Sequence, residues 1–543
     1  MKILLIGINS KYIHPSVSLY QLNKNTTYEC DILELTIKDS LNNCINKIYQ
    51  YDLKDYNLIG CSCYLWNISI YLDLIKELKK ENPHLKFVLG GPEVAYDVKY
   101  YLTNFSDIDY ILTGEGEESF HELCQYIDDK ISLSEVSNLY YKDRNEIRFS
   151  YFKKPDLTKI ALATLDIPDY QNRIVYLESS RGCPYKCSYC TASLDNQVRY
   201  FPLEKVLDIL YQLMINKTKV VKFLDRTFNA NYNYMRSILD FIDQHNICTI
   251  FQFEVVGELL RKDIIDRIKN LRFKYLRFEI GIQSTNSKVN EAVCRKQNMP
   301  KLKENIYLLN QTNKVDLHID LIAGLPYETK ESFISSFNEA FLLKGKELRL
   351  GFLKFLRGTK MLDLVDEHEY VYSSDSPYEI ISNKYMSNDD LKEIEKVEKS
   401  LNRYYNSNII PRVFNYLFEH NLVSSFYNFF LELYKDIEHY QKHELFIILD
   451  EYLKIAFQDN YDELHFNLLI DYLENYKVKP KIWWNIEKFN REELFAKIVE
   501  QQNSITLELL YRYSVVLKYE NLVYVIIYKD FNPLHYQIEL KQH

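Results

Sequence analysis

The sequence predicts an α/β protein with a doubly wound parallel sheet at the N-terminus, a partial barrel of six strand–helix units in the centre and a mainly helical C-terminal part. Short apolar runs alternate with helical patterns through residues 1–140 and again through residues 171–375. Such alternation is typical of parallel sheets with helical crossovers. From residue 376 onward the pattern becomes one of amphipathic helices. We therefore expect domains at 1–140, 171–375 and 376–543, with a linker at 141–170.

Composition indicates a multidomain globular protein, since the chain has 543 residues of which 47% are apolar. The net charge is −9 and the sequence has no basic tail, so nucleic-acid binding is not indicated. The apolar run after Met1-Lys2 is too short for a signal peptide. The sequence contains no run of about 18 uncharged apolar residues, so no membrane span is expected. We expect a cytoplasmic protein whose ten cysteines do not form a disulfide framework.

The first sheet is expected to contain five strands, at 2–8, 30–35, 58–63, 85–89 and 110–112. Helices are expected from residue 16 and over 66–80, and a small hairpin over 140–146. Glycines and small polar residues follow the strands, notably Gly90-Gly91 and the loop Thr113 to Glu117. Ligands bind at these carboxyl ends in open parallel sheets, so the pattern indicates a ligand site. The alternative is that the glycines only form turns.

The second domain has six strand-like runs, at 174–177, 220–224, 249–255, 275–283, 315–321 and 349–356. Charged residues in these runs or at their ends, such as Asp225, Glu254 and Glu279, need a ligand or a partner. Structural ion pairs are the alternative explanation. His318 and Asp320 alternate with apolar neighbours, so both are candidates for substrate contact or proton handling.

Three cysteines with C-x3-C-x2-C spacing, Cys183, Cys187 and Cys190, follow the first of these runs. They cannot all pair off as disulfides, but they can hold three corners of one metal cluster. A closed zinc site takes four ligands, and no Cys or His stands among residues 191–194. Three thiolates on a four-iron cluster leave one iron open to another ligand. A zinc site or three unrelated core cysteines are the alternatives.

The cysteine loop resembles that of the radical S-adenosylmethionine (radical SAM) superfamily, with Tyr189 as the aromatic residue before the last cysteine. The resemblance implies a [4Fe-4S] cluster whose open iron binds S-adenosylmethionine, with Tyr189 at the adenine. It further implies contacts from Asp225 near the methionine amino group, Glu254 and Gln283 at the ribose and carboxylate, and Gly324 under the adenine. The usual Gly-Gly-Glu after the second strand is absent, and residues 224–228 read Leu-Asp-Arg-Thr-Phe instead.

Residues 1–140 resemble the flavodoxin-like cobalamin-binding domain that precedes the radical SAM domain in one large subclass. The resemblance implies cobalamin contacts from Asn9, Tyr12, Ser62, Tyr64, Gly90, Gly91, Thr113, Gly114, Glu115 and Gly116. Better-known cobalamin domains carry Asp-x-His-x-x-Gly after the first strand. Here His14 has Tyr12 in place of the Asp and Val17 in place of the Gly. The carboxylate that would orient the imidazole is missing, so His14 is not expected to bind cobalt.

Together these resemblances imply a class B radical SAM methyltransferase, which cleaves S-adenosylmethionine to a deoxyadenosyl radical and methylates an unactivated carbon through cobalamin. They also imply an external one-electron donor such as flavodoxin or ferredoxin, while the substrate stays unknown. Two alternatives stay open: a non-methylating cobalamin-dependent reaction (cyclisation, ring contraction or oxidation) and a cluster-binding redox sensor.

The C-terminal part is expected to contain helices at 391–405, 410–436, 443–457 and 463–473 and strands at 522–528 and 536–540. Its residues 378–406 resemble an uncharacterised C-terminal domain of some cobalamin-binding radical SAM proteins, which identifies no substrate.

Overall fold

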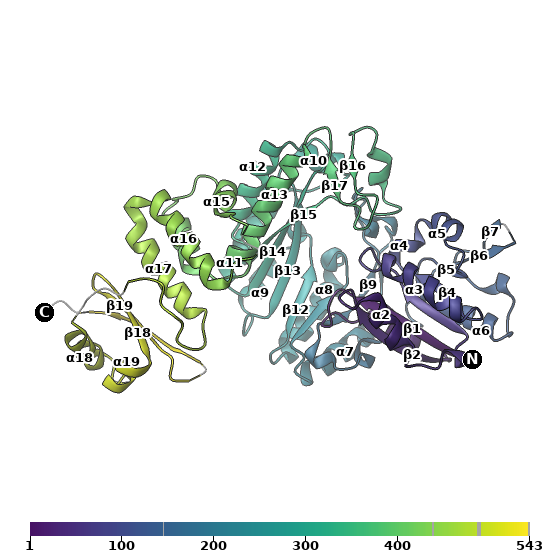
Figure 1. Ribbon diagram of the computed structural model, residues 1–543, viewed down its shortest axis with the longest axis horizontal. Coiled ribbons are helices and arrows are strands. Elements are labelled where there is room, and N and C mark those ends of the chain that lie inside the picture. The colour runs from purple at the N-terminus through teal and green to yellow at the C-terminus, as the bar shows by residue number, and fades with distance from the viewer. Residues whose placement is uncertain (145, 437–438, 486–489, 531, 541–543) are drawn as a thin grey trace. The chain divides into compact units, whose positions relative to one another are not determined.

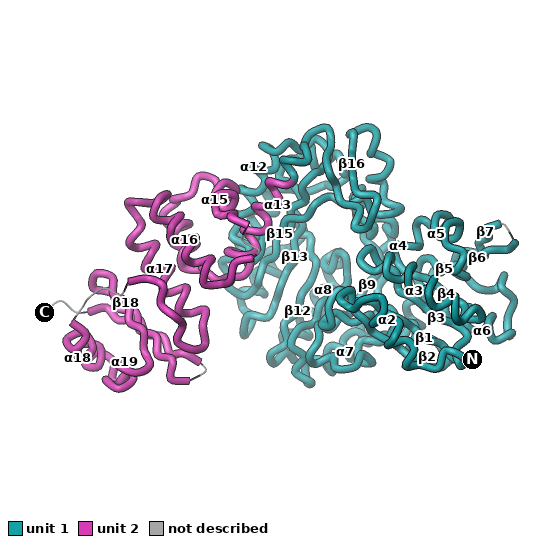
Figure 2. The backbone as a smooth tube through the Cα atoms, viewed as in Figure 1, with its two compact units in different colours: residues 1–391 teal, residues 392–543 magenta. Residues whose placement is uncertain are grey.

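The computed structural model describes residues 1–144, 146–436, 439–485, 490–530 and 532–540 of the chain. The chain forms two compact units, residues 1–391 and residues 392–543 (Figure 2). Unit 1 contains the first two predicted domains, and unit 2 contains most of the predicted C-terminal part. No helix among the described residues is long and apolar enough to cross a membrane.

A seven-stranded sheet with the order β2-β1-β3-β4-β5-β6-β7 forms the N-terminal part of unit 1 (Figure 1). The parallel strands are β1 (Lys2–Asn9), β2 (Glu29–Thr36), β3 (Leu58–Ser62), β4 (Lys86–Gly90) and β5 (Tyr110–Leu112). The order 2-1-3-4-5 is that of flavodoxin-like folds, which bind ligands where the strand order reverses between β1 and β3. All five expected strands are present.

Both faces of this sheet are buried, which explains the almost continuous apolar runs in its strands. Leu4 and Ile6 of β1 belong to one core cluster, whereas Ile3 and Leu5 belong to another. The helices of this part are α1 (Val17–Lys24), α2 (Leu41–Ile48), α3 (Ile68–Glu81), α4 (Pro92–Ala95), α5 (Val98–Asn104) and α6 (Gly116–Ile127).

The expected hairpin is present as β6 (Leu139–Asp143) and β7 (Glu146–Phe149). Its strand β6 pairs antiparallel with β5, so the hairpin extends the first sheet. The predicted hairpin includes residue 145, which lies outside the described residues.

A second sheet, with the order β15-β14-β13-β12-β11-β8, is parallel throughout and forms the partial barrel. Its strands are β8 (Val175–Leu177), β11 (Val220–Phe223), β12 (Ile250–Glu254), β13 (Leu276–Gln283), β14 (Val315–Ala323) and β15 (Glu347–Phe352). The helices are α7 (Leu203–Ile215), α8 (Tyr232–His245), α9 (Lys262–Lys269), α10 (Ser287–Ala292), α11 (Met299–Thr312) and α12 (Lys330–Phe341). All six expected strands are present.

A short antiparallel ladder between β9 (Ser180–Arg181) and β10 (Arg199–Tyr200) closes the loop that carries the three cysteines. Two further short strands, β16 (Val371–Tyr372) and β17 (Ile380–Ser382), pair after the barrel. Helix α13 (Asn388–Leu401) begins three residues before the predicted range, where Ser387 Oγ accepts the Asp390 N–H and Asp390 Oδ2 accepts the Ser387 N–H. This reciprocal capping satisfies two backbone donors at the helix end.

Unit 2 is mainly helical and ends in a three-stranded antiparallel sheet. Its elements are α14 (Pro411–Glu419), α15 (Phe426–Leu433), α16 (Lys442–Ala456), α17 (Tyr461–Glu474), α18 (Arg491–Gln501), α19 (Leu507–Tyr513), β18 (Ser514–Tyr519), β19 (Leu522–Ile527) and β20 (Leu534–Glu539). The helical region expected over 410–436 is two helices, because the chain turns after α14 at Asn421, whose φ is 49°. Strand β18 was not predicted.

Candidate functional site

The cysteine loop places its three thiols on one compact turn. Cys183 and Cys187 are buried, Cys190 is half-buried, and none forms a disulfide. The Cys183 N–H donates to Asp195 O at 2.9 Å, and the Cys190 N–H donates to Cys187 O at 3.1 Å. Gly182 has φ 87°, and a Cβ added there would lie 2.3 Å from Gln197 O. A glycine is therefore required where the loop folds back on itself.

The surroundings of the thiols suit an iron–sulfur cluster. Burial raises the pKa of Cys190, and the nearby Cys187 and Cys183 raise it further. Three thiolates gathered in this way repel one another unless a metal neutralises them. A cation also lies close to the thiols: Arg295 Nη1 is 3.9 Å from Cys187 Sγ. Sequence reasoning missed Arg295, because it lies 105 residues after Cys190 and no local pattern connects the two. No three His, Cys, Asp or Glu side chains of the described chain converge tightly enough for a single metal ion.

Asp225 supports the base of the cysteine loop. Its carboxylate accepts the Ser179 N–H at 2.9 Å, the Ser179 hydroxyl at 2.6 Å and the Ser180 hydroxyl at 2.5 Å. The residue is buried, and desolvation raises its pKa. Asp225 thus connects the end of β11 to the start of the loop, and its two carboxylate oxygens already accept protein donors.

The other strand-end residues of the barrel lie where the sequence expected them. Gln283 ends β13 with φ 67°, and no donor among the described residues reaches its buried Oε1. Gly324 follows β14 with φ 89°, and its carbonyl accepts hydrogen bonds from Tyr370 and Asn383, both at 3.0 Å. Glu254 Oε1 lies 3.6 Å from Arg226 Nη1, and burial raises the pKa of Glu254.

Tyr189 is half-buried in the cysteine loop. Burial is the main cause of its raised pKa, and the nearby Cys187 and Cys190 raise the pKa further. The phenol therefore stays protonated beside these cysteines.

Polar and charged side chains from four barrel strands meet on one face of the sheet. Glu279 of β13 accepts from Lys222 of β11 at 3.0 Å, Gln252 of β12 at 2.6 Å and Arg349 of β15 at 2.6 Å. Contacts between strands that are not neighbours mean that these side chains cross the concave interior. Glu279 is therefore held in structural ion pairs, which was the alternative to ligand binding for the charged strand residues. The Arg349 side chain stays 42% exposed, so this interior is open to water.

His318 and Asp320 of β14 contribute to the same interior. Arg349 Nη2 lies 2.8 Å from His318 Nδ1, and burial lowers the pKa of His318. A guanidinium can only donate, so Nδ1 accepts and the imidazole is neutral. Burial raises the pKa of Asp320 to about 7, and within the described chain no donor reaches its Oδ1. The barrel thus holds a neutral imidazole and a carboxyl group with one unpartnered oxygen, two residues apart on one strand.

A cavity of about 780 Å³ lies between the carboxyl ends of the first sheet and the cysteine loop. The predicted site residues that line it are Asn9, Ser62, Tyr64, Gly90, Gly91, Gly114, Glu115 and Gly116. The cysteine-loop side contributes Arg181, Gly182 and Thr191. Segments more than a hundred residues apart in the sequence therefore form one cavity.

Two glycines that line this cavity have a positive φ. Gly91 has φ 111°, and a Cβ there would lie 2.4 Å from Cys63 O, so only glycine is tolerated. Gly114 has φ 68°, and a Cβ there would meet nothing within 4 Å. Tyr64 and Trp66 stack with ring centroids 4.5 Å apart, and both line the cavity. Trp66 was missed, although an aromatic residue two positions after Tyr64 was a visible signal.

Two predicted contacts, Thr113 and Tyr12, lie outside the cavity lining, whereas His14 lies within it. Thr113 lies outside the cavity lining, and its hydroxyl donates to Asn138 O at 3.2 Å. Tyr12 also lies outside it, 60% exposed, with its ring on the Arg173 guanidinium. His14 lines the cavity, but its Nδ1 lies 2.6 Å from Tyr176 Oη, and burial lowers its pKa.

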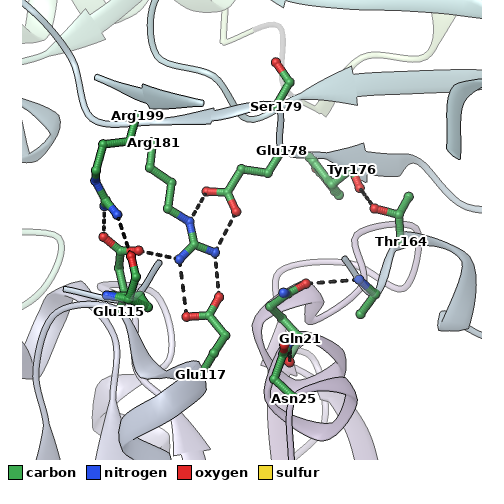
Figure 3. Close-up of polar contacts among 12 residues, drawn as sticks. Gln21, Asn25, Glu115, Glu117, Thr164, Tyr176, Glu178, Ser179, Arg181 and Arg199 are labelled. Carbon is green, nitrogen blue, oxygen red and sulfur yellow. Dashed lines mark hydrogen bonds and ion pairs between the residues drawn. The ribbon is translucent and has the colours of Figure 1, made fainter. Parts of the chain in front are cut away.

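An ion-pair network joins the two sides of the cavity (Figure 3). Arg181, two residues before Cys183, contacts Glu115 and Glu117 of the first sheet and Glu178 at the end of β8. Arg199, across the β9–β10 ladder, also pairs with Glu115. Both oxygens of Glu115 are therefore occupied by arginines.

Three family models match successive parts of the chain. Residues 5–124 match the B12 binding domain, residues 177–340 match the radical SAM superfamily, and residues 366–532 match a protein family of unknown function, DUF4080. The first two matches cover the two sides of the cavity.

Curated relatives match about half of the chain. An uncharacterised methyltransferase of Pyrococcus horikoshii, PH0819, is 24% identical over 56% of this chain and 67% of its own length. The cobalamin-dependent radical SAM methyltransferase TokK of Streptomyces tokunonensis is 25% identical over 51% of this chain and 44% of its own length. The chain thus matches from less than half to two thirds of the length of these relatives.

One solved structure has a similar fold over most of the chain. It is the cobalamin-dependent S-adenosylmethionine radical enzyme OxsB, described with aqua-cobalamin and S-adenosylmethionine bound. The TM-score is 0.62 at 13% sequence identity, and the match covers 93% of this chain and 81% of that chain. At an identity this low, the match shows a shared fold alone.

Proposed function

This chain belongs to the cobalamin-binding radical SAM enzymes, and on that premise we propose that it methylates an unactivated carbon of its substrate. The cofactors of such an enzyme are a [4Fe-4S] cluster, S-adenosylmethionine and cobalamin. When bound, they supply an electron, a deoxyadenosyl radical and a methyl carrier. The observation that carries the proposal is the single cavity between the B12-binding sheet and the cysteine loop, because it would bring the methyl carrier to the mouth of the barrel.

The site residues have distinct proposed roles. Cys183, Cys187 and Cys190 would hold the cluster, and Tyr189 would pack against the adenine. The unpartnered Oε1 of Gln283 and the weakly paired carboxylate of Glu254 would bind polar groups of S-adenosylmethionine. Gly324 would lie under the adenine. A Cβ there would approach Ile380 Cδ1 to 2.6 Å, so this turn requires glycine.

A second set of residues would hold cobalamin. Gly90, Gly91, Gly114 and Gly116 would allow its close approach to the backbone, and Asn9, Ser62 and Tyr64 would contact its edge. His14 would keep its contact with Tyr176 and leave the cobalt free of a protein imidazole.

The substrate would enter the concave face of the barrel. His318 and Asp320 are proposed to contact it, because a charged and partly open interior would accept a polar group. Parallel barrels usually fill this space with bulky branched side chains. An external one-electron donor such as flavodoxin or ferredoxin is also proposed.

Anaerobic reconstitution with iron, sulfide and cobalamin tests the proposal. The loaded protein should cleave S-adenosylmethionine under reducing conditions. With an extract of a strain that lacks the gene, it should also form S-adenosylhomocysteine and a methylated product. Deoxyadenosine as the only nucleoside product, together with an unmethylated new compound, would identify the cyclisation or oxidation class instead. A protein that binds iron without cleaving S-adenosylmethionine would be a redox sensor.

A further inference from the structure

The guanidinium of Arg181 uses all five of its N–H donors on three carboxylates. Nε and Nη2 donate to Glu178 at 3.0 and 2.9 Å, Nη1 and Nη2 donate to Glu117 at 3.3 and 2.5 Å, and Nη1 donates to Glu115 at 2.5 Å. An arginine has five donors in a fixed planar arrangement, so none is left over. Few single side chains can hold three acceptors in this way.

The three carboxylates come from two different parts of unit 1. Glu115 and Glu117 lie at the start of α6, in the loop that lines the cavity from the B12-binding side. Glu178 follows β8, and Arg181 lies in β9 at the foot of the cysteine loop. Figure 3 shows the guanidinium between the two groups of acidic side chains. Arg181 therefore connects the cavity loop with the loop that carries the cluster ligands.

Burial makes this network sensitive to the exact shape of its cation. The side chains of Arg181 and Glu117 are only 11% and 5% exposed. Removing one partner of a buried ion pair leaves an uncompensated charge and strongly destabilises the fold. Lysine would keep the charge but has a point-like ammonium with three donors, so it cannot reach all three carboxylates in the same geometry.

We infer that Arg181 is a positioning residue that links cobalamin binding to cluster binding. This inference rests on the proposed cofactor sites. A cluster would order the cysteine loop and with it Arg181, while cobalamin would order the loop of Glu115 and Glu117. Because both loops share one network, the cofactor that binds first orders it for the second. Each cofactor therefore raises the affinity for the other by the same factor.

Cobalamin titrations of the full-length protein test the linkage. Absorption spectra would give the Kd for hydroxocobalamin with and without the reconstituted cluster. In the wild-type protein we expect binding about tenfold tighter when the cluster is present. In Arg181→Lys we expect weaker binding overall and a ratio close to unity, while the iron content and the cluster absorption stay near wild type.

Arg357→Lys is the matched control. Arg357 also joins the first sheet to the region after the barrel, through Glu93 at 3.0 Å, Asp97 and the Tyr378 hydroxyl at 3.2 Å. Its side chain is 20% exposed, and neither Arg357 nor Glu93 lines the cavity. This variant should keep the tenfold ratio of the wild type.

Two results would overturn the inference. One is equal cobalamin affinity of the wild-type protein with and without the cluster. The other is an equal loss of the ratio in Arg181→Lys and Arg357→Lys, which would mean that any weakened packing within unit 1 has this effect. A wild-type protein that binds no cobalamin at all would instead contradict the proposed function.

Discussion

At the scale of single residues, the cysteines carry the strongest expectation. Replacing Cys183, Cys187 or Cys190 with Ala should remove the cluster, because three thiolates are the only protein ligands proposed for it. The content of about four iron atoms per reconstituted chain should fall sharply, and cleavage of S-adenosylmethionine should cease. Cys248→Ala is the control, since Cys248 is exposed and lies outside the loop. A single Cys-loop variant that keeps full iron and full cleavage would contradict the assignment.

Glu328 gives a pH-dependent prediction. Its side chain is fully buried and accepts the Ser284 hydroxyl at 2.6 Å, and burial raises its pKa to about 8 from 4.5. Between pH 4.5 and 8 the folded state keeps a proton that the unfolded state has lost, so the stability of wild type falls as pH rises through this window. Glu328→Gln mimics the protonated form and should remove this loss.

Denaturant unfolding at several pH values would measure the effect. Glu328→Gln should match wild type near pH 4 and exceed it at pH 8.5 by roughly 4 to 5 kcal/mol in unfolding free energy. Glu331→Gln changes an exposed glutamate of α12 and should show no such pH dependence. Parallel wild-type and Glu328→Gln curves across this range would mean that Glu328 ionises normally in the folded state.

At the scale of elements, the turn after β4 is set by Gly91 alone. Gly91→Ala should destabilise the first sheet by roughly 2 kcal/mol or more, since its φ of 111° and its contact with Cys63 O both exclude a side chain. Gly90→Ala should be mild, because its Cβ would meet only Leu112 O at 3.7 Å. Thermal unfolding and cobalamin titration would separate the two variants. Equal behaviour of both would show that the tight turn is not required.

Sequence predicted the elements of the two parallel sheets more fully than those of unit 2. Buried parallel strands such as β1 and β14 are long apolar runs bounded by glycine or polar residues, and this pattern is local. Strand β18 follows α19 directly, at Ser514, with no glycine or proline to separate them. The break between α14 and α15 depends on the left-handed Asn421, which helix periodicity does not reveal.

At the scale of the whole molecule, the two compact units predict two unfolding transitions. The cavity, the cysteines and the Arg181 network all belong to unit 1. Cobalamin at a hundred times its Kd should therefore stabilise the first unit by about 2.7 kcal/mol and leave the second unchanged. Differential scanning calorimetry with and without cobalamin would measure this. A shift of both transitions by the same amount would mean that the units unfold together.

The sequence alone predicted the order of the folds, the cysteine motif and eight of the residues that line the cavity. These depend on local patterns, namely strand runs, glycines at strand ends and one closely spaced motif. Only the tertiary structure decided which of these residues face one another. Glu115 and Arg181 lie 66 residues apart in the chain, yet they are partners in one ion-pair network. Arg295 likewise reaches Cys187 from 108 residues away. Pairings of this kind follow from how parallel strands bring their carboxyl ends together, and no short-range spacing encodes them.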